Sequence, residues 1–190
     1  MMLRKAEREA IDRLWQRKLD QDAKGVPQSE RHRNLEPASA EFICALAAGT
    51  GATRMVEIGG SSGISTIALA AAARENVGRL ISIEIDAARQ AESRQTLSGL
   101  GLEPMVDFRM GDAAVLLPNL AEVDFALIDC EKEDYNRFFD MLKVARGGIV
   151  VADNILSHDL ADYVAHVRKH PGAESVTLNV GKGLEVTKLL

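Results

Sequence analysis

The stretch from Arg54 to Ala70 constrains the fold of this chain more than any other segment. An apolar run predicts a buried strand over 54–58, and an alanine-rich run predicts a helix over 63–74. Between them lies a loop with almost no side-chain bulk, Gly59-Gly-Ser-Ser-Gly63. Such a loop lets a ligand come close to the backbone and to the N-terminus of the helix. A strand, a glycine turn and a helix in this order indicate a nucleoside-binding α/β protein.

The next expected strand, over 80–84, has an acid, Glu84, at its end. In doubly wound sheets an acid there accepts hydrogen bonds from ribose hydroxyls. Gly59 and Gly63 are four residues apart, unlike the glycines of a dinucleotide fold, and Glu57 would repel a pyrophosphate. A ligand with a cationic group suits these residues better, and S-adenosylmethionine combines an ammonium, a sulfonium and an adenosine ribose. The alternative is a strand, turn and helix without a ligand, as in any α/β protein.

Composition favours an ordinary globular protein. With 190 residues, 46% of them hydrophobic, we expect a single domain over 1–190, made of an N-terminal helix and lid segment (1–37) and a core (38–190). A net charge of −5 argues against broad nucleic-acid affinity. No apolar run approaches the roughly 18 residues of a membrane span, and the N-terminus lacks the apolar core of a signal peptide. Two cysteines give no disulfide framework, so we expect a cytoplasmic protein.

The rest of the chain alternates expected strands and helices. An amphipathic helix over 3–22 would dock on the domain or on a partner subunit, and a surface loop over 23–38 follows. Further strands are expected over 105–109, 124–128 and 148–152, and further helices over 38–49, 87–98, 113–117, 134–144 and 158–169. Two final strands, 175–180 and 184–190, are joined through Gly181-Lys-Gly183 as a hairpin. We therefore predict a Rossmann-like α/β fold: a doubly wound, mostly parallel seven-stranded sheet with an antiparallel C-terminal hairpin strand.

Residues that directly follow the expected strands form the candidate site, because ligands of open α/β sheets bind beyond the carboxyl ends of the strands. Asp129, Asp153 and Asn154 offer two carboxylates and an amide, which suit Mg²⁺. The pair Asp153-Asn154 fits a helix cap or a turn equally well. Lys132 lies three residues after Asp129. An amine beside a bound cation holds its proton less tightly and can act as a base, although a solvated lysine is the simpler interpretation.

Five segments resemble, in order, the successive motifs of the S-adenosylmethionine-dependent O-methyltransferases. The segments are Val56–Thr66, Ile83–Asp86, Met110–Ala113, Leu127–Tyr135 and Val151–Asn154. The group that they resemble most is the cation-dependent one, which includes catechol and caffeoyl-coenzyme A O-methyltransferases and small bacterial relatives. The resemblance covers residues 33–190 and implies the class I methyltransferase fold.

The resemblance also implies a role for each candidate residue. The cofactor would be bound by Leu35, Glu57, Gly59, Gly60, Ser61, Ser65, Glu84, Asp112, Ala113 and Asp129. Glu84 would take both ribose hydroxyls, and the Ser65 hydroxyl with the loop amides would hold the carboxylate of the methionine part. The metal would be held by Asp129, Asp153 and Asn154, and Lys132 would be the catalytic base.

We therefore expect an enzyme that transfers a methyl group from S-adenosylmethionine to a hydroxyl of a small, aromatic vicinal-diol acceptor. Mg²⁺ or another divalent cation would chelate two neighbouring oxygens, lower the pKa of one hydroxyl and align it with the methyl group. The alternatives are a metal-independent methyltransferase and an S-adenosylmethionine-binding protein without chemistry of its own; the glycine spacing disfavours a dehydrogenase. The expected partner is a small-molecule acceptor, with no nucleic acid or membrane, and the expected assembly is a homodimer that uses the first helix.

Overall fold

The computed structural model of the chain describes residues 2–27 and 30–190. Its strands are β1 (Arg54–Ile58), β2 (Arg79–Glu84), β3 (Val106–Met110), β4 (Val123–Ile128), β5 (Val144–Ala152), β6 (Ala173–Leu178) and β7 (Leu184–Leu189). They form one sheet in the order β3-β2-β1-β4-β5-β7-β6, with β1 to β5 parallel. Strand β7 runs antiparallel to both β5 and β6. This arrangement confirms the predicted fold class, including the hairpin that closes the sheet.

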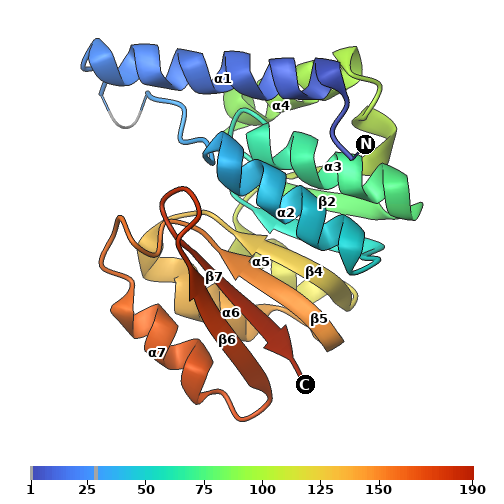
Figure 1. Cartoon of the computed structure of the whole chain (residues 1–190), viewed down its shortest axis with the longest axis vertical. Helices are drawn as coiled ribbons and strands as arrows, with labels where there is room; N and C mark the ends of the chain where they lie inside the picture. The colour runs from blue at the N-terminus through green and yellow to red at the C-terminus, as the bar shows by residue number, and fades with distance from the viewer. Residues whose placement is uncertain (1, 28–29) are drawn as a thin grey trace.

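The helices surround the sheet on both faces (Figure 1). They are α1 (Lys5–Ala23), α2 (Pro37–Gly49), α3 (Ile64–Asn76), α4 (Ala87–Gly99), α5 (Ala113–Leu116), α6 (Tyr135–Met141) and α7 (Ala161–Lys169), with short 3₁₀ turns at Glu103–Met105, Leu117–Asn119 and Lys132–Asp134. Three predicted boundaries were wrong by three residues or more. Helix α6 ends at Met141 and not at 144, because Val144 already belongs to β5. Strand β5 begins at Val144 and not at 148, because Gly147 and Gly148 lie inside the strand next to an irregularity in its pairing with β4. Helix α7 begins at Ala161 and not at 158, because turns occupy the preceding segment.

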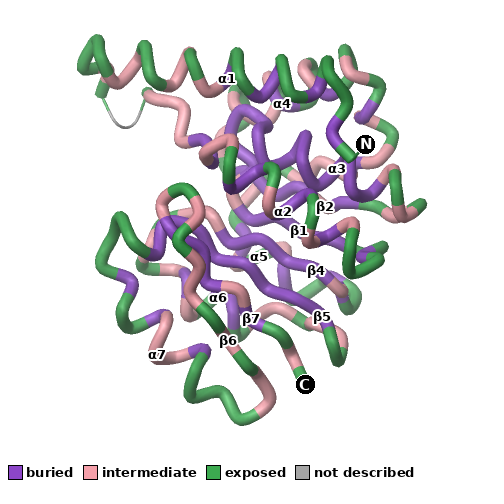
Figure 2. Tube along the Cα trace, in the orientation of Figure 1, coloured by how far each residue is buried: buried purple, intermediate pink, exposed green. Residues whose placement is uncertain are grey.

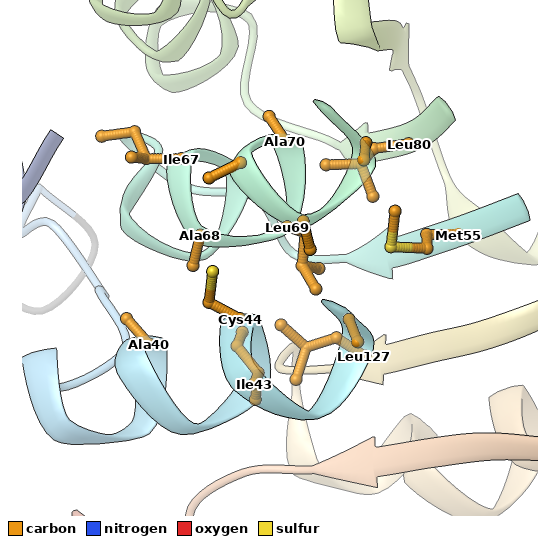
Figure 3. Packing of buried hydrophobic residues seen from close by; sticks show 14 of the residues in the cluster. Ala40, Ile43, Cys44, Met55, Ile67, Ala68, Leu69, Ala70, Leu80 and Leu127 are labelled. Atoms are coloured by element: carbon orange, nitrogen blue, oxygen red, sulfur yellow. The ribbon is translucent and has the colours of Figure 1, made fainter. Parts of the chain in front are cut away.

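Side chains of the central strands alternate between two hydrophobic clusters, as the pleat requires. Met55 and Leu127 belong to the cluster under α1 to α4, whereas Val56 and Ile128 belong to the cluster under α5 to α7. Figure 2 shows that the central strands are buried along most of their length. In Figure 3, Cys44 of α2 points toward Ala68 of α3 within the first cluster. The sheet is therefore covered on both sides, and ligands can reach only its ends and edges.

Helix α1 docks on its own chain. Its residues Ala10, Ile11 and Leu14 are buried, and Glu7, which is also buried, forms an ion pair with Arg74 of α3. Figure 1 shows α1 lying across the outside of α3. Of the two docking modes predicted for this helix, the structure therefore uses the one within the chain. Within the described ranges, no helix combines the length and apolar character that a bilayer crossing needs.

The strand register brings the candidate residues into one row. Ile58 pairs with Ile128, and Ile128 pairs with Ala152. The hydrogen bonding continues one residue further, because the Asp129 amide donates to the Ile58 carbonyl at 3.0 Å and the Asp153 amide donates to the Ile128 carbonyl at 3.1 Å. The residues after β1, β4 and β5 thus lie side by side at the carboxyl edge of the sheet, where ligands of such sheets bind.

Candidate active site

A cavity of about 340 Å³ opens at this carboxyl edge. Its volume is within the range of small-molecule sites. The predicted site residues that line it are Gly59, Ser61, Glu84, Asp112, Ala113, Asp129, Lys132 and Asn154. The structure therefore brings together residues from the ends of five strands in one hollow.

Glu84 ties the glycine loop to the end of β2. One oxygen of its buried carboxylate accepts a hydrogen bond from the Ser61 amide at 2.7 Å, and the other accepts one from the Asp86 amide at 2.9 Å. Asp86 in turn caps α4, accepting from the amides of Ala88 and Arg89. Because an ionised carboxylate has about four acceptor positions, two of those on Glu84 remain for hydroxyls of a ligand. The carboxylate is thus held in place before any ligand arrives.

Gly59 lets the loop pass directly over the end of β4. A Cβ atom on Gly59 would lie only 2.0 Å from the carbonyl oxygen of Asp129, and φ at Gly59 is +96°. Both observations require glycine, because any side chain would collide with the backbone and would strain the left-handed conformation. The cofactor loop and Asp129 consequently form one packed unit.

Glu57 lies beneath the loop and not at the cavity wall. Its Oε1 atom accepts hydrogen bonds from Thr66 Oγ1 at 2.5 Å and from Ser82 Oγ at 2.6 Å. Burial raises the pKa of Glu57, while the hydroxyls of Ser82 and Thr66 oppose that rise. The alternation along β1 explains the placement, because Glu57 points to the face opposite Val56 and Ile58. Its contact with the cofactor stays a prediction.

Three more of the predicted residues do not line the cavity. Ser65, in the first turn of α3, is buried. Gly60 packs against the Ser82 side chain, because a Cβ on Gly60 would lie 2.6 Å from Ser82 Oγ. Leu35 is buried in the cluster under α1 to α4. Its neighbour Asn34 faces the cavity instead.

The segment 30–36 contributes residues 31–34 to the cavity wall. Arg33 forms a two-pronged ion pair with Glu131, and Asn34 Oδ1 accepts a hydrogen bond from Ser62 Oγ at 2.9 Å. The Nδ2 atom of Asn34 and the Oγ atom of Ser61 are buried without a hydrogen-bond partner. Buried polar atoms are rarely left unsatisfied, so these two are available to a polar ligand in the cavity.

Asp129, Asp153 and Asn154 meet at the ends of β4 and β5. Asn154 Nδ2 donates to Asp129 Oδ1 at 2.8 Å, and Oδ1 of Asp153 is buried without a hydrogen-bond partner. Burial raises the pKa of Asp129, and burial together with the charge of Asp129 raises the pKa of Asp153 to about 7. Asn154 has φ of +68°, which is uncommon for a residue other than glycine. Of the three, only Asp129 and Asn154 line the cavity itself, and Asp153 is buried.

This trio fits a divalent cation. Two neighbouring buried carboxylates are costly to ionise unless a cation compensates them, and the orphaned Asp153 oxygen is a free ligand atom. Hard divalent cations take oxygen ligands, and the carbonyl oxygen of an amide side chain is one of them. In the described part of the chain, no three His, Cys, Asp or Glu side chains gather into a metal-holding group. The fit therefore rests on the amide of Asn154 as the third donor.

Lys132 is held between Asp129 and Tyr135. Its ammonium donates to the Tyr135 hydroxyl at 2.8 Å and lies 3.7 Å from Asp129 Oδ1, and its side chain is 19% exposed. The Tyr135 hydroxyl donates onward to the backbone carbonyl of Asp153 at 3.2 Å. Burial raises the pKa of Tyr135, so this hydroxyl keeps its proton. A freely solvated Lys132 does not fit this placement.

Sequence reasoning missed four residues of the site: Arg33, Tyr135, His158 and Lys182. Tyr135 directly contacts Lys132 but does not line the cavity; the other three line it. Tyr135 follows Lys132 at a helical spacing of three, which could have linked the two. Lys182 lies in the hairpin turn, where lysine is ordinary, so no local pattern indicates its role.

Comparisons with known proteins agree with this geometry. The sequence profile of a family described as O-methyltransferase matches residues 16–185. A catechol O-methyltransferase from Niastella koreensis is 34% identical over 130 residues, which cover 65% of this chain and 58% of that protein. One from Mycobacterium tuberculosis is 32% identical over 155 residues, which cover 73% of this chain and 70% of that protein. The match thus spans less than two thirds of the Niastella protein.

The fold recurs in solved structures. An O-methyltransferase from Bacillus cereus, crystallised in complex with S-adenosylhomocysteine (SAH), aligns with a TM-score of 0.80 at 20% sequence identity. The alignment covers 96% of this chain and 91% of that one. At this identity the likeness establishes the shared fold.

Proposed function

The chain belongs to the O-methyltransferase family, and from this premise we propose that it transfers a methyl group from S-adenosylmethionine to a hydroxyl of a small aromatic acceptor. We further propose that the acceptor carries two neighbouring hydroxyls and that a divalent cation assists. One observation carries the proposal: a single cavity joins the glycine loop and Glu84 to Asp129, Asn154 and Lys132. The names of the two catechol O-methyltransferases support the same chemistry.

The β1 to β3 side of the cavity suits the cofactor. Glu84 has free acceptor positions for two ribose hydroxyls, and its hold on Ser61 keeps the loop in shape. Asn34 Nδ2 and Ser61 Oγ are available to the carboxylate of the methionine part. Asp112 caps α5 through the Ala114 amide and lines the cavity beside Ala113, where adenine would lie. Bound S-adenosylmethionine supplies an activated methyl group.

The β4 and β5 side suits a divalent cation and the acceptor. Asp129, Asp153 and Asn154 would hold the cation, which supplies Lewis acidity toward an acceptor hydroxyl. The residues of the chain then have two tasks. They align the acceptor oxygen with the methyl group, and they exclude water under the segment 30–36. Arg33, by its ion pair with Glu131, fastens that segment to the metal side of the cavity.

Lys132 is the proposed base. Its ammonium is held by Tyr135 and Asp129, and its side chain lines the cavity in which the acceptor would bind. It would take the proton that the acceptor hydroxyl loses on methylation. Cys130 also lines the cavity, but burial raises the pKa of its thiol, so it is unsuited to act as a nucleophile. Both cysteines are free thiols, which accords with the reducing cytoplasm that we propose as the location.

The test is methyl transfer from labelled S-adenosylmethionine to catechol and 3,4-dihydroxybenzoate, with and without Mg²⁺. We expect a monomethylated product with Mg²⁺, none after chelation, and recovery when Mg²⁺ is restored. SAH should still bind in chelator, as measured by calorimetry. Full turnover in excess chelator would contradict the metal and favour a metal-independent methyltransferase. Binding of SAH without turnover of any acceptor would favour a cofactor-binding protein.

A further inference from the structure

We infer that Lys182 selects acceptors that carry a carboxylate, so that the preferred substrates are aromatic acids with vicinal hydroxyls and not neutral diphenols. This inference rests on the proposed function and adds the class of acceptor. Lys182 lies in the connection between β6 and β7 and lines the cavity together with Asp129, Lys132 and Asn154.

The backbone around Lys182 is anchored to the metal side of the site. The Lys182 carbonyl accepts a hydrogen bond from the Leu156 amide at 2.9 Å, and the Gly183 carbonyl accepts one from the Ile155 amide at 3.0 Å. Ile155 and Leu156 directly follow Asn154 in the chain. The hairpin turn and the segment after the predicted metal ligands are therefore one packed unit, which holds the lysine beside the trio.

The sheet order shows which end of the cavity Lys182 occupies. Glu84 is the last residue of β2 and Asp112 follows β3, on one side of the sheet, whereas the predicted metal ligands follow β4 and β5. Strand β7, which begins just after Lys182, is the next neighbour of β5. A cofactor over β1 to β3 and reacting hydroxyls at the trio leave the far end of the acceptor directed toward β7. That end of the acceptor meets Lys182.

The Lys182 ammonium lacks a counterion among the side chains that line the cavity. Within the described ranges, no hydrogen bond or ion pair involves the Lys182 ammonium, which is half-buried. The other lysine and arginine side chains that line the cavity each have an acidic partner: Lys18 and Arg31 with Asp22, Arg33 with Glu131, Lys132 with Asp129, and Arg89 with Asp86.

Asp129 and Asp153, whose charges interact with that of Lys182, do not serve as its counterions. Burial raises the pKa of both Asp129 and Asp153, and the positive charges of Lys132 and Lys182 oppose that rise. Once these acids hold a divalent cation, their charge is compensated and Lys182 still lacks an anion. A half-enclosed ammonium gains most from a charge-assisted hydrogen bond to a carboxylate. His158, exposed on the neighbouring segment and lining the same cavity, adds a polar group beside it.

The experiment compares 3,4-dihydroxybenzoate with its methyl ester, which keeps both hydroxyls and removes the negative charge. For each protein we would measure the acid-to-ester ratio of kcat/KM with S-adenosylmethionine and Mg²⁺. The difference in intrinsic reactivity between acid and ester cancels when this ratio is compared between variants. Wild type should favour the acid by about 10-fold or more, because hydrogen bonds to charged groups contribute roughly 1.5–3 kcal/mol.

The variants separate charge from structure. Lys182→Gln should lower the ratio by about 10-fold, mainly through KM for the acid, and Lys182→Glu should lower it further, while Lys182→Arg should keep the preference. Lys188→Gln, at an exposed lysine of β7, is the matched control and should leave the ratio unchanged. An unchanged ratio in Lys182→Gln overturns the inference.

A binding arm distinguishes failure of this inference from failure of the proposed function. The Kd of each acceptor is measured by calorimetry in the presence of SAH and Mg²⁺. Tighter binding of the acid that is lost in Lys182→Gln supports the inference even if neither acceptor is methylated. Equal binding of acid and ester to wild type overturns it, whether or not turnover occurs.

Discussion

At the scale of single residues, Glu84 has two tasks. Its carboxylate holds the loop through Ser61 and the start of α4 through Asp86, and the remaining acceptor positions face the cavity. Because these groups are already ordered in the free protein, less conformational entropy is lost when a ligand binds.

The Glu84→Ala variant tests the second task. Loss of two hydrogen bonds to ribose hydroxyls should weaken SAH binding by roughly 2–3 kcal/mol, or about 30- to 150-fold in Kd. Calorimetric titration measures the change, and a thermal melt checks that the loop and fold survive. Glu122→Ala, at an exposed acid, is the control. An unchanged Kd in a folded Glu84→Ala protein contradicts the assignment.

Lys132 is tested by Lys132→Met, which keeps the length of the side chain and removes the amine. If Lys132 is the base, the rate of methyl transfer should fall by roughly 10²–10⁴, with little change in SAH affinity. Hydroxide partly replaces a lost base, so the deficit should shrink as pH rises. Lys169→Met, at an exposed lysine, is the control. A fall of less than about tenfold would mean that the cation alone ionises the acceptor.

Asp153 gives a pH-dependent prediction for the protein in chelator. Its pKa is raised to about 7 from 3.8, first by burial and then by the charge of Asp129. A carboxyl with a raised folded-state pKa contributes its full stability below its unfolded pKa and loses it as pH rises toward 7. Above that pH the wild type holds a buried, ionised carboxylate, at a cost of at most about 4 kcal/mol.

The Asp153→Asn variant removes this cost. Its melting temperature minus that of wild type, both in chelator, should therefore increase between about pH 5 and about pH 8. Differential scanning calorimetry measures it. Asp159→Asn, at an exposed aspartate, should show no such trend. A difference that stays constant with pH would mean that Asp153 is not ionising in this range.

At the scale of elements, the turn between β1 and α3 depends on contact with the end of β4. Gly59→Ala would place a Cβ 2.0 Å from the Asp129 carbonyl oxygen at a φ of +96°. We expect the free energy of unfolding to fall by more than about 2 kcal/mol. Urea denaturation followed by circular dichroism measures the change.

The matched control for this turn is Gly99→Ala at the last residue of α4. A Cβ there meets nothing within 4 Å, and φ at Gly99 is not in the left-handed region. Alanine should leave the free energy of unfolding unchanged or raise it by up to about 1 kcal/mol. Equal stability of the two variants would contradict the close packing of the loop on β4.

At the scale of the whole molecule, the predicted homodimer stays a prediction. The apolar residues of α1 pack on this chain, so an interface through α1 would have to use its outer side, where Leu19 is 39% exposed. Light scattering should give a mass of twice 20.6 kDa for a dimer. Leu19→Glu should shift the protein toward the monomer without loss of fold. A wild-type mass of 20.6 kDa contradicts the dimer.

The sequence by itself determined the elements and the chemistry available to them. Alternation of apolar residues marked the strands, and the segment Gly59-Gly-Ser-Ser-Gly63 marked the cofactor-type turn. Parallel strands share one carboxyl edge, so the residues after β4 and β5 could be predicted to meet, and Asp129 does contact Asn154. Each of these inferences is local, or follows from a rule of α/β topology.

Only the tertiary structure decided which of these side chains face the cavity and what lies next to them. Glu57 and Glu84 are both acids at strand ends, but the pleat directs Glu57 beneath the loop while Glu84 lines the cavity. Lys182 reaches the site because β7 pairs with β5 as well as with β6. That pairing joins segments that are far apart in the chain. The position of β7 in the sheet depends on the packing of the whole molecule, and no local sequence pattern predicts it.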